Sequence, residues 1–78
     1  MVNVAVHIAS GTFSKDWNDW VSIIPSSDLR PSMPVIIYDV STLVVAKLVD
    51  NKDTIAFKTT TGANRTQSFY GSATYARK

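Results

Sequence analysis

Cysteine and glutamate are both absent from this chain of 78 residues, and leucine is scarce. Without cysteine the protein has no disulfide to brace a small fold, no thiolate metal site and no cysteine nucleophile. Glutamate and leucine favour helices, whereas the abundant valine, isoleucine and threonine lose rotamer freedom in a helix and pack well on a pleated sheet. The composition therefore predicts an all-β protein.

Long hydrophobic runs and a strong net charge are missing as well. No apolar run approaches the roughly 18 residues of a membrane-spanning helix, and no basic segment typical of a signal peptide precedes the first apolar residues. The hydrophobic fraction of 45% is too high for a disordered tail, and a net charge of +2 indicates no particular partner. We expect one soluble globular domain over residues 1–78, too short for a multidomain enzyme. Since a strand pattern begins directly after Met1, we also expect that it is excised from a longer chain.

The period of the apolar residues locates the strands. Large apolar side chains at every second position indicate a strand with one buried face, and turn-forming residues separate the apolar segments. We predict strands at Val2–Ile8, Trp20–Ile24, Val35–Tyr38, Leu43–Val49, Thr54–Thr60 and Gln67–Arg77. The turn residues 50–53 predict a hairpin, and the two prolines in the segment 26–34 predict an irregular crossing loop. This spacing is typical of a small antiparallel β-barrel or sandwich of about six or seven strands.

The small size of the domain predicts self-association. Ordering a residue costs roughly 1.5 kcal/mol, which a core of this size offsets only narrowly. The segment Leu43–Val49 is apolar on both faces except at Lys47. We therefore expect the chain to bury surface against copies of itself.

Residues that could carry out catalysis are few. His7 is the only histidine, no strained serine turn with flanking glycines accompanies it, and the aspartates fall mostly in turns, where they cap backbone N–H groups. The turn 50–53 lacks the bidentate glutamate of a calcium loop. We predict no enzymatic activity, no metal and no cofactor.

Aromatic residues are the better candidates for binding. Trp17 and Trp20 lie three apart in a polar segment, where they either close the end of the core or leave one ring exposed to stack on a sugar or a partner chain. Tyr70 has the opposite strand parity to Phe69 and Tyr75, which predicts that it faces away from the core. The cations are scattered, so a nucleic-acid module of the OB type is a weaker alternative.

The order of several short motifs resembles a known family. The alternating strand Val4–Ile8, the break at Gly11 and the Trp17/Trp20 segment are followed by Leu29-Arg30-Pro31, a hairpin through Asp53–Phe57 and a closing Gly71–Lys78. In this order they resemble the C-terminal head domains of siphophage receptor-binding and baseplate proteins, above all those of the lactococcal phages. The resemblance covers almost the full length.

The resemblance implies a function without catalysis. It implies a small β-barrel that assembles as a homotrimer at the tip of a phage tail, in the virion baseplate or tail fibre, and binds cell-wall saccharide of the host. It implies neither nucleic-acid binding nor membrane insertion. The alternative within the same setting is a structural domain that contacts only other baseplate proteins.

The resemblance also bears on the site residues. In the family a His and an Asp on one strand of the central hairpin and an aromatic on the other line the cleft, and these positions correspond to Ala46, Leu48 and Phe57. Only the aromatic is retained. The predicted ligand-binding residues are Phe57, Trp17 and Tyr70, with Trp20 as the alternative to Trp17. For Arg30 we predict a scaffold role, in which the guanidinium bonds loop carbonyls or an aspartate.

Overall fold

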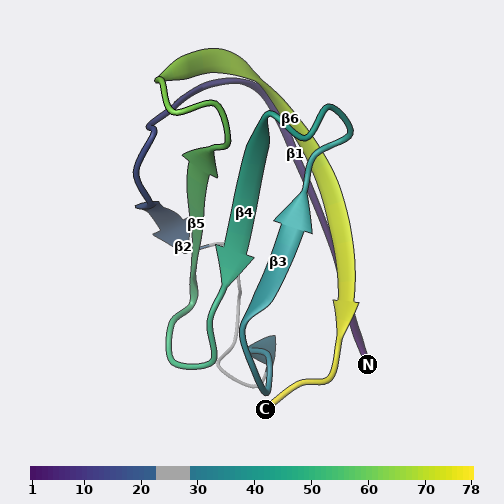
Figure 1. The fold of residues 1–78 in the computed structure, drawn as a ribbon. Helices are drawn as coiled ribbons and strands as arrows, with labels where there is room; N and C mark the ends of the chain where they lie inside the picture. The colour runs from purple at the N-terminus through teal and green to yellow at the C-terminus, as the bar shows by residue number, and fades with distance from the viewer. Residues whose placement is uncertain (23–28) are drawn as a thin grey trace.

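The computed structural model describes residues 1–22 and 29–78, and these form six strands (Figure 1). The strands are β1 Val2–Phe13, β2 Asn18–Ser22, β3 Val35–Tyr38, β4 Val44–Leu48, β5 Thr54–Thr59 and β6 Arg65–Tyr75. None of the described residues forms an α-helix, and so none forms one that could cross a membrane. The all-β prediction is confirmed. The predicted end of the second strand and the first part of the crossing loop, residues 23–28, lie outside the described residues.

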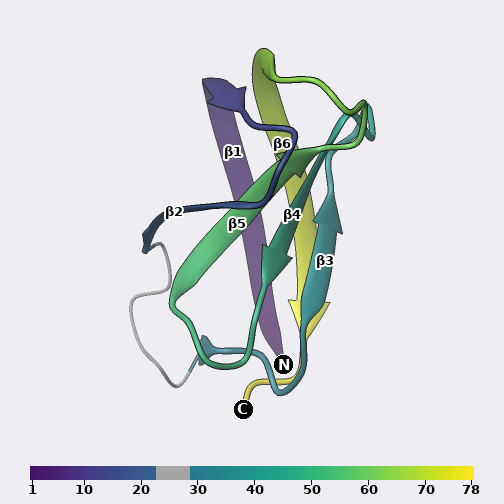
Figure 2. The same cartoon turned by 60° about the vertical axis from the view of Figure 1, so that its left-hand side comes forward.

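The strands form two antiparallel sheets (Figure 2). One sheet contains β1 and β6, and the other has the order β2-β5-β4-β3. Of the two predicted arrangements, a barrel or a sandwich, the closed barrel is not formed, because among the described residues β1 forms a ladder only with β6 and no ladder joins it to β2. The molecule is therefore open along the side between β1 and β2.

On the opposite side the two sheets nearly meet. The backbone N–H of Val40, just beyond β3, donates to the carbonyl of Tyr70 in β6 at 3.2 Å. A Cβ atom at Gly71 would lie 2.6 Å from the carbonyl oxygen of Tyr38. The close approach of β6 to β3 thus depends on the missing side chain at position 71.

Apolar side chains from both sheets fill the space between them. The predicted row Val2, Val4, Val6 and Ile8 is half-buried and packs against the core. The core centres on three phenylalanine rings from β1, β5 and β6, which lie 5.1 to 6.3 Å apart and are fully buried: Phe13, Phe57 and Phe69. The parity predicted for the first and last strands is confirmed.

Strand β1 is longer than predicted because it continues through a bulge. The pairing with β6 shifts register between Ile8 and Gly11, where the sequence indicated a break. An inserted residue bends a strand without ending it. A Cβ atom at Gly11 would lie 2.9 Å from the Trp20 indole, so glycine makes room for that ring. The bulge carries the chain on to Phe13 and places the next turn over the four-stranded sheet.

The crossing loop is fastened to two other parts of the chain. Arg30 donates from Nε to Oδ1 of Asp53 in the β4–β5 turn, which confirms the predicted interaction with an aspartate. The N–H of Ser32 donates to the carbonyl of Ala76 at 2.9 Å, and that of Lys78 donates to the carbonyl of Arg30 at 2.7 Å. The loop therefore joins the β4–β5 hairpin to the C-terminal segment.

Aspartate caps a turn as expected at Asp39. Its buried carboxylate accepts hydrogen bonds from the backbone N–H of Leu43 at 3.2 Å, the Ser41 hydroxyl at 2.9 Å and the Gln67 amide at 3.1 Å. These bonds close the turn between β3 and β4, which sets the register of that hairpin.

Candidate functional site

The site lies on the outer face of the four-stranded sheet, beneath the turn that joins β1 to β2. In this turn the N–H of Asp16 donates to the Ser14 hydroxyl at 3.1 Å, and the N–H of Lys15 donates to the Asn64 side chain at 3.0 Å. The N–H of Thr59 at the end of β5 donates to the Ser14 carbonyl at 2.9 Å, which holds the segment against the sheet. Trp17 then lies over β4 and β5. The indole remains 39% exposed.

Two lysine side chains from the sheet lie against this indole. Lys47 on β4 follows the core residue Ala46, and Lys58 on β5 follows the core residue Phe57. Because successive side chains of a strand point to opposite faces, both lysines point outward. Their Nζ atoms are 4.3 Å and 5.4 Å from the centre of the Trp17 ring. Both distances lie within the range of cation–π attraction.

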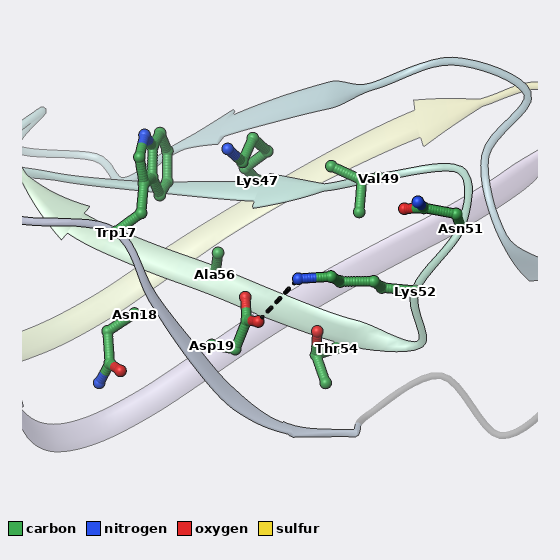
Figure 3. A pocket seen from close by; sticks show the side chains of 9 residues that line it. All are labelled: Trp17, Asn18, Asp19, Lys47, Val49, Asn51, Lys52, Thr54 and Ala56. Carbon is green, nitrogen blue, oxygen red and sulfur yellow. Dashed lines mark hydrogen bonds and ion pairs between the residues drawn. The ribbon is translucent and has the colours of Figure 1, made fainter.

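A depression of about 580 Å³ opens beside the indole. Figure 3 shows Trp17 and Lys47 at one end of it, and a dashed line joins Asp19 to Lys52 across its middle. Its lining is polar apart from the indole and two small aliphatic side chains, and comprises Trp17, Asn18, Asp19, Lys47, Val49, Asn51, Lys52, Thr54 and Ala56. Its volume falls in the range of small-ligand pockets, about 300 to 1,000 Å³.

Several polar groups in the depression are available to a ligand. The Asp19–Lys52 ion pair is 3.1 Å long, and both side chains are about half exposed. A pair of this kind contributes only about 0–1 kcal/mol and can exchange partners at little cost. Thr54 at the start of β5 does not add to them, because its Oγ1 is buried, with no hydrogen-bond partner among the described residues. The site thus combines one exposed ring with amide, carboxylate and ammonium groups.

Phe57, the residue that the family resemblance favoured, lies in the core instead. It is 1% exposed, and its ring is 5.1 Å from that of Phe69. Its strand partner Ala46 and the neighbouring position Leu48 are also fully buried. The three positions matched to the family cleft therefore point between the two sheets. Phe57 packs in the core at the wall of an apolar cleft between the sheets, and it does not line the depression beside Trp17.

Trp20 is a packing residue as well. Its ring stacks on Phe13 at 5.3 Å and 17°, and it lies 4.9 Å from the Phe57 ring. Of the two tryptophans, Trp17 is therefore the exposed one, and its alternative Trp20 belongs to the core packing.

Tyr70 is exposed, as its parity indicated, but it lies elsewhere. It is 58% exposed on the outer face of the two-stranded sheet, where its ring makes an edge contact with His7 at 5.3 Å. The outer faces of the two sheets lie on opposite sides of the molecule (Figure 2). The structure does not bring Tyr70 and Trp17 together.

The polar residues of the depression were not predicted. The strand parity that put Ile55 and Phe57 on one face also puts Lys58 on the other, so the two outward lysines could have been found from the hairpin. The contributions of Asp19 and Asn51 could not, because they depend on how β2 and the β4–β5 turn lie beside Trp17.

No known protein family, curated protein or solved structure matches the chain. The geometry of the site is therefore the main basis for a functional proposal.

Proposed function

We propose that the protein binds a saccharide, without catalysis, in the depression beside Trp17. The observation that carries this proposal is the partly exposed indole of Trp17 beside a depression lined mostly by polar residues. The C–H face of a pyranose is apolar and can stack on an aromatic ring, while neighbouring donors and acceptors fix its hydroxyls. Asn18, Asn51 and the Asp19–Lys52 pair supply such groups within the same depression.

A saccharide fits this site better than a single-stranded nucleic acid. Strand-binding proteins stack successive bases on several rings along a basic groove. Here Trp17 is the only ring among the described residues that line the depression. One ring with polar groups around it matches one sugar unit and its neighbours.

We further propose that the chain acts as the receptor-binding head of a phage tail and recognises a polysaccharide of the host cell wall. The order of motifs that resembles the siphophage heads supports this setting, and so does the all-β architecture. In this setting the protein belongs to the virion and functions as a homotrimer. Strand β1 supports self-association, because its edge toward β2 forms no ladder in the described part of the chain and its twelve residues contain neither proline nor a charged side chain.

Binding to cells and to isolated wall polysaccharide tests the proposal. The fluorescently labelled protein should be retained on intact Gram-positive cells, and purified wall polysaccharide should compete it off. Trp17→Ala should weaken retention at least about fivefold, as expected for truncation of a contact residue. Tyr70→Ala removes an exposed ring from the opposite side and should bind like the parent. Equal binding by parent and Trp17→Ala, or tighter binding to a ten-nucleotide oligo-dT than to any polysaccharide, would contradict the proposal.

A structural role in a baseplate is the second candidate. Strand β3 and the second residue after its end expose three large apolar side chains at alternate positions, Ile36, Tyr38 and Val40, which are 43%, 61% and 84% exposed. Such a row is typical of a protein contact. If this is the main function, the protein binds no cells at high micromolar concentration, and Tyr38→Ser lowers its affinity for a neighbouring baseplate protein.

A further inference from the structure

We propose that the saccharide bound beside Trp17 is acidic, and that its carboxylate or phosphate group lies between Lys47 and Lys58. This inference rests on the proposed function, which it narrows to one class of sugar. Charged side chains of the site and their spacing carry it.

The described residues around the indole carry a clear excess of positive charge. Three ammonium groups, those of Lys47, Lys52 and Lys58, lie at the depression or against the ring, with the single carboxylate of Asp19. Asp19 pairs with Lys52. In the part of the chain that the structure describes, neither Lys47 nor Lys58 has a carboxylate within ion-pair distance.

The two unpaired lysines lie close enough to act on one anion. Lys47 is opposite Ala56 and Lys58 is opposite Val45, so the lysines are diagonal neighbours on one face of the β4–β5 ladder. Long side chains in this relation are within reach of each other, and their two positive charges repel. Both ammonium groups also lie near the same ring. A bound anion would remove this repulsion.

The ring and the lysines make different demands on one ligand. The indole offers an apolar surface for a sugar ring, whereas the lysines offer two point charges and no acceptor. A neutral sugar would stack on the indole and leave the two lysines without an anionic partner. A free anion would use only the lysines. A sugar with an acidic substituent uses both.

Matched pairs of sugars test this inference. The first pair is trigalacturonate and its methyl ester, which differ in charge and hardly in shape, and the second is maltotriose with and without a 6-phosphate. Inorganic phosphate alone forms a third arm. We expect the acidic member of at least one pair to bind at least tenfold more tightly than its neutral partner in calorimetry at 50 mM NaCl. The preference should largely disappear at 1 M NaCl, where the Debye length falls to about 3 Å.

Single lysine variants give a second readout. Lys47→Gln and Lys58→Gln should each weaken the acidic sugar about fivefold and the neutral partner less than twofold. Arg65→Gln removes the same charge from the start of β6, outside the site, and should leave both affinities unchanged.

The possible failures are distinguishable. If Trp17→Ala abolishes binding but neutral and acidic sugars bind equally well, the inference is wrong and the proposed function remains. If inorganic phosphate competes as well as the acidic sugar, the lysines hold a simple ion and the inference is wrong. If Trp17→Ala leaves all sugar binding intact, or if no sugar binds, both the inference and the proposed function are wrong.

Discussion

Two aromatic side chains on neighbouring elements have opposite roles. Phe57 is enclosed by other rings between the sheets, whereas Trp17 covers the outside of one sheet and stays partly in water. Phe57 was a candidate for the site because of the family resemblance, and Trp17 because it lies in a polar segment. Phe57 points from the inner face of β5 into the core, whereas Trp17 lies over the outer face, next to Lys58 of the same strand.

At the residue scale this difference predicts two distinct phenotypes. Phe57→Ala should lower the free energy of unfolding by about 3–5 kcal/mol, because it leaves a cavity in a close-packed core. Trp17→Ala should lower it by about 1 kcal/mol or less, since its ring is exposed and its lysine contacts are weak. Urea denaturation followed by far-ultraviolet circular dichroism measures both.

Phe57→Leu keeps most of the buried volume and serves as a control. It should lose clearly less stability than Phe57→Ala. Equal losses for Phe57→Ala and Trp17→Ala would show that the indole belongs to the core, and the candidate site would then lack its exposed ring.

At the scale of elements, the fastening of the crossing loop gives the protein an acid-sensitive contact. The hydrogen bond from Arg30 lowers the pKa of the Asp53 carboxyl below its ordinary value of 3.8. A carboxyl whose pKa is lower in the folded than in the unfolded chain stabilises the fold above the unfolded-state pKa. That contribution is lost as the pH falls through the folded-state pKa.

As the pH falls below about 4, the parent protein should therefore lose the part of its stability that this contact contributes. Asp53→Asn has no carboxyl to titrate, and Arg30→Gln removes the group that lowers its pKa. Both variants should show a smaller drop in urea midpoint than the parent between pH 5 and pH 3. The same drop in all three proteins would mean that groups other than the Arg30–Asp53 pair account for the acid sensitivity.

The elements also show which information a sequence contains. Alternation over Val2–Ile8 and the turn residues 50–53 act locally, so the strands and the hairpin could be predicted from them. The continuation of β1 through its bulge could not, because it depends on Trp20 filling the space above Gly11. The candidate site is non-local for the same reason: Trp17 meets Lys47 only after the sheet has formed.

For the whole molecule, the open side between β1 and β2 predicts self-association. An apolar cleft lies there, lined by Val4, Val6, Ile8 and Trp20 among others, beside a strand edge without protective charges. Light scattering at micromolar concentration should give about three times the chain mass of 8.6 kDa. The expected number of three copies comes from the family resemblance, whereas the unpaired edge of β1 predicts self-association without fixing the number of copies.

Ala5→Lys places a charge on that edge strand, at an exposed position beside the cleft-lining residues Val4 and Val6. It should yield a monomer with an unchanged circular dichroism spectrum. Ser68→Lys, an exposed position on β6, is a matched control that should leave the mass unchanged. A monomeric parent protein would contradict the prediction.

The pairing of the first and last strands has a mechanical consequence. Val2 lies opposite Tyr75, so the two ends of the chain lie at the same end of the molecule (Figure 1). Hydrogen bonds in an antiparallel pair run across the strands. A force that pulls Met1 away from Lys78 would therefore load these bonds one after another and separate β1 from β6, starting at this end. A force applied at only one of the two termini would not pull the paired ends of β1 and β6 apart. The protein held by a single terminus can thus bear tension that would open the β1–β6 pair if the protein were held by both termini.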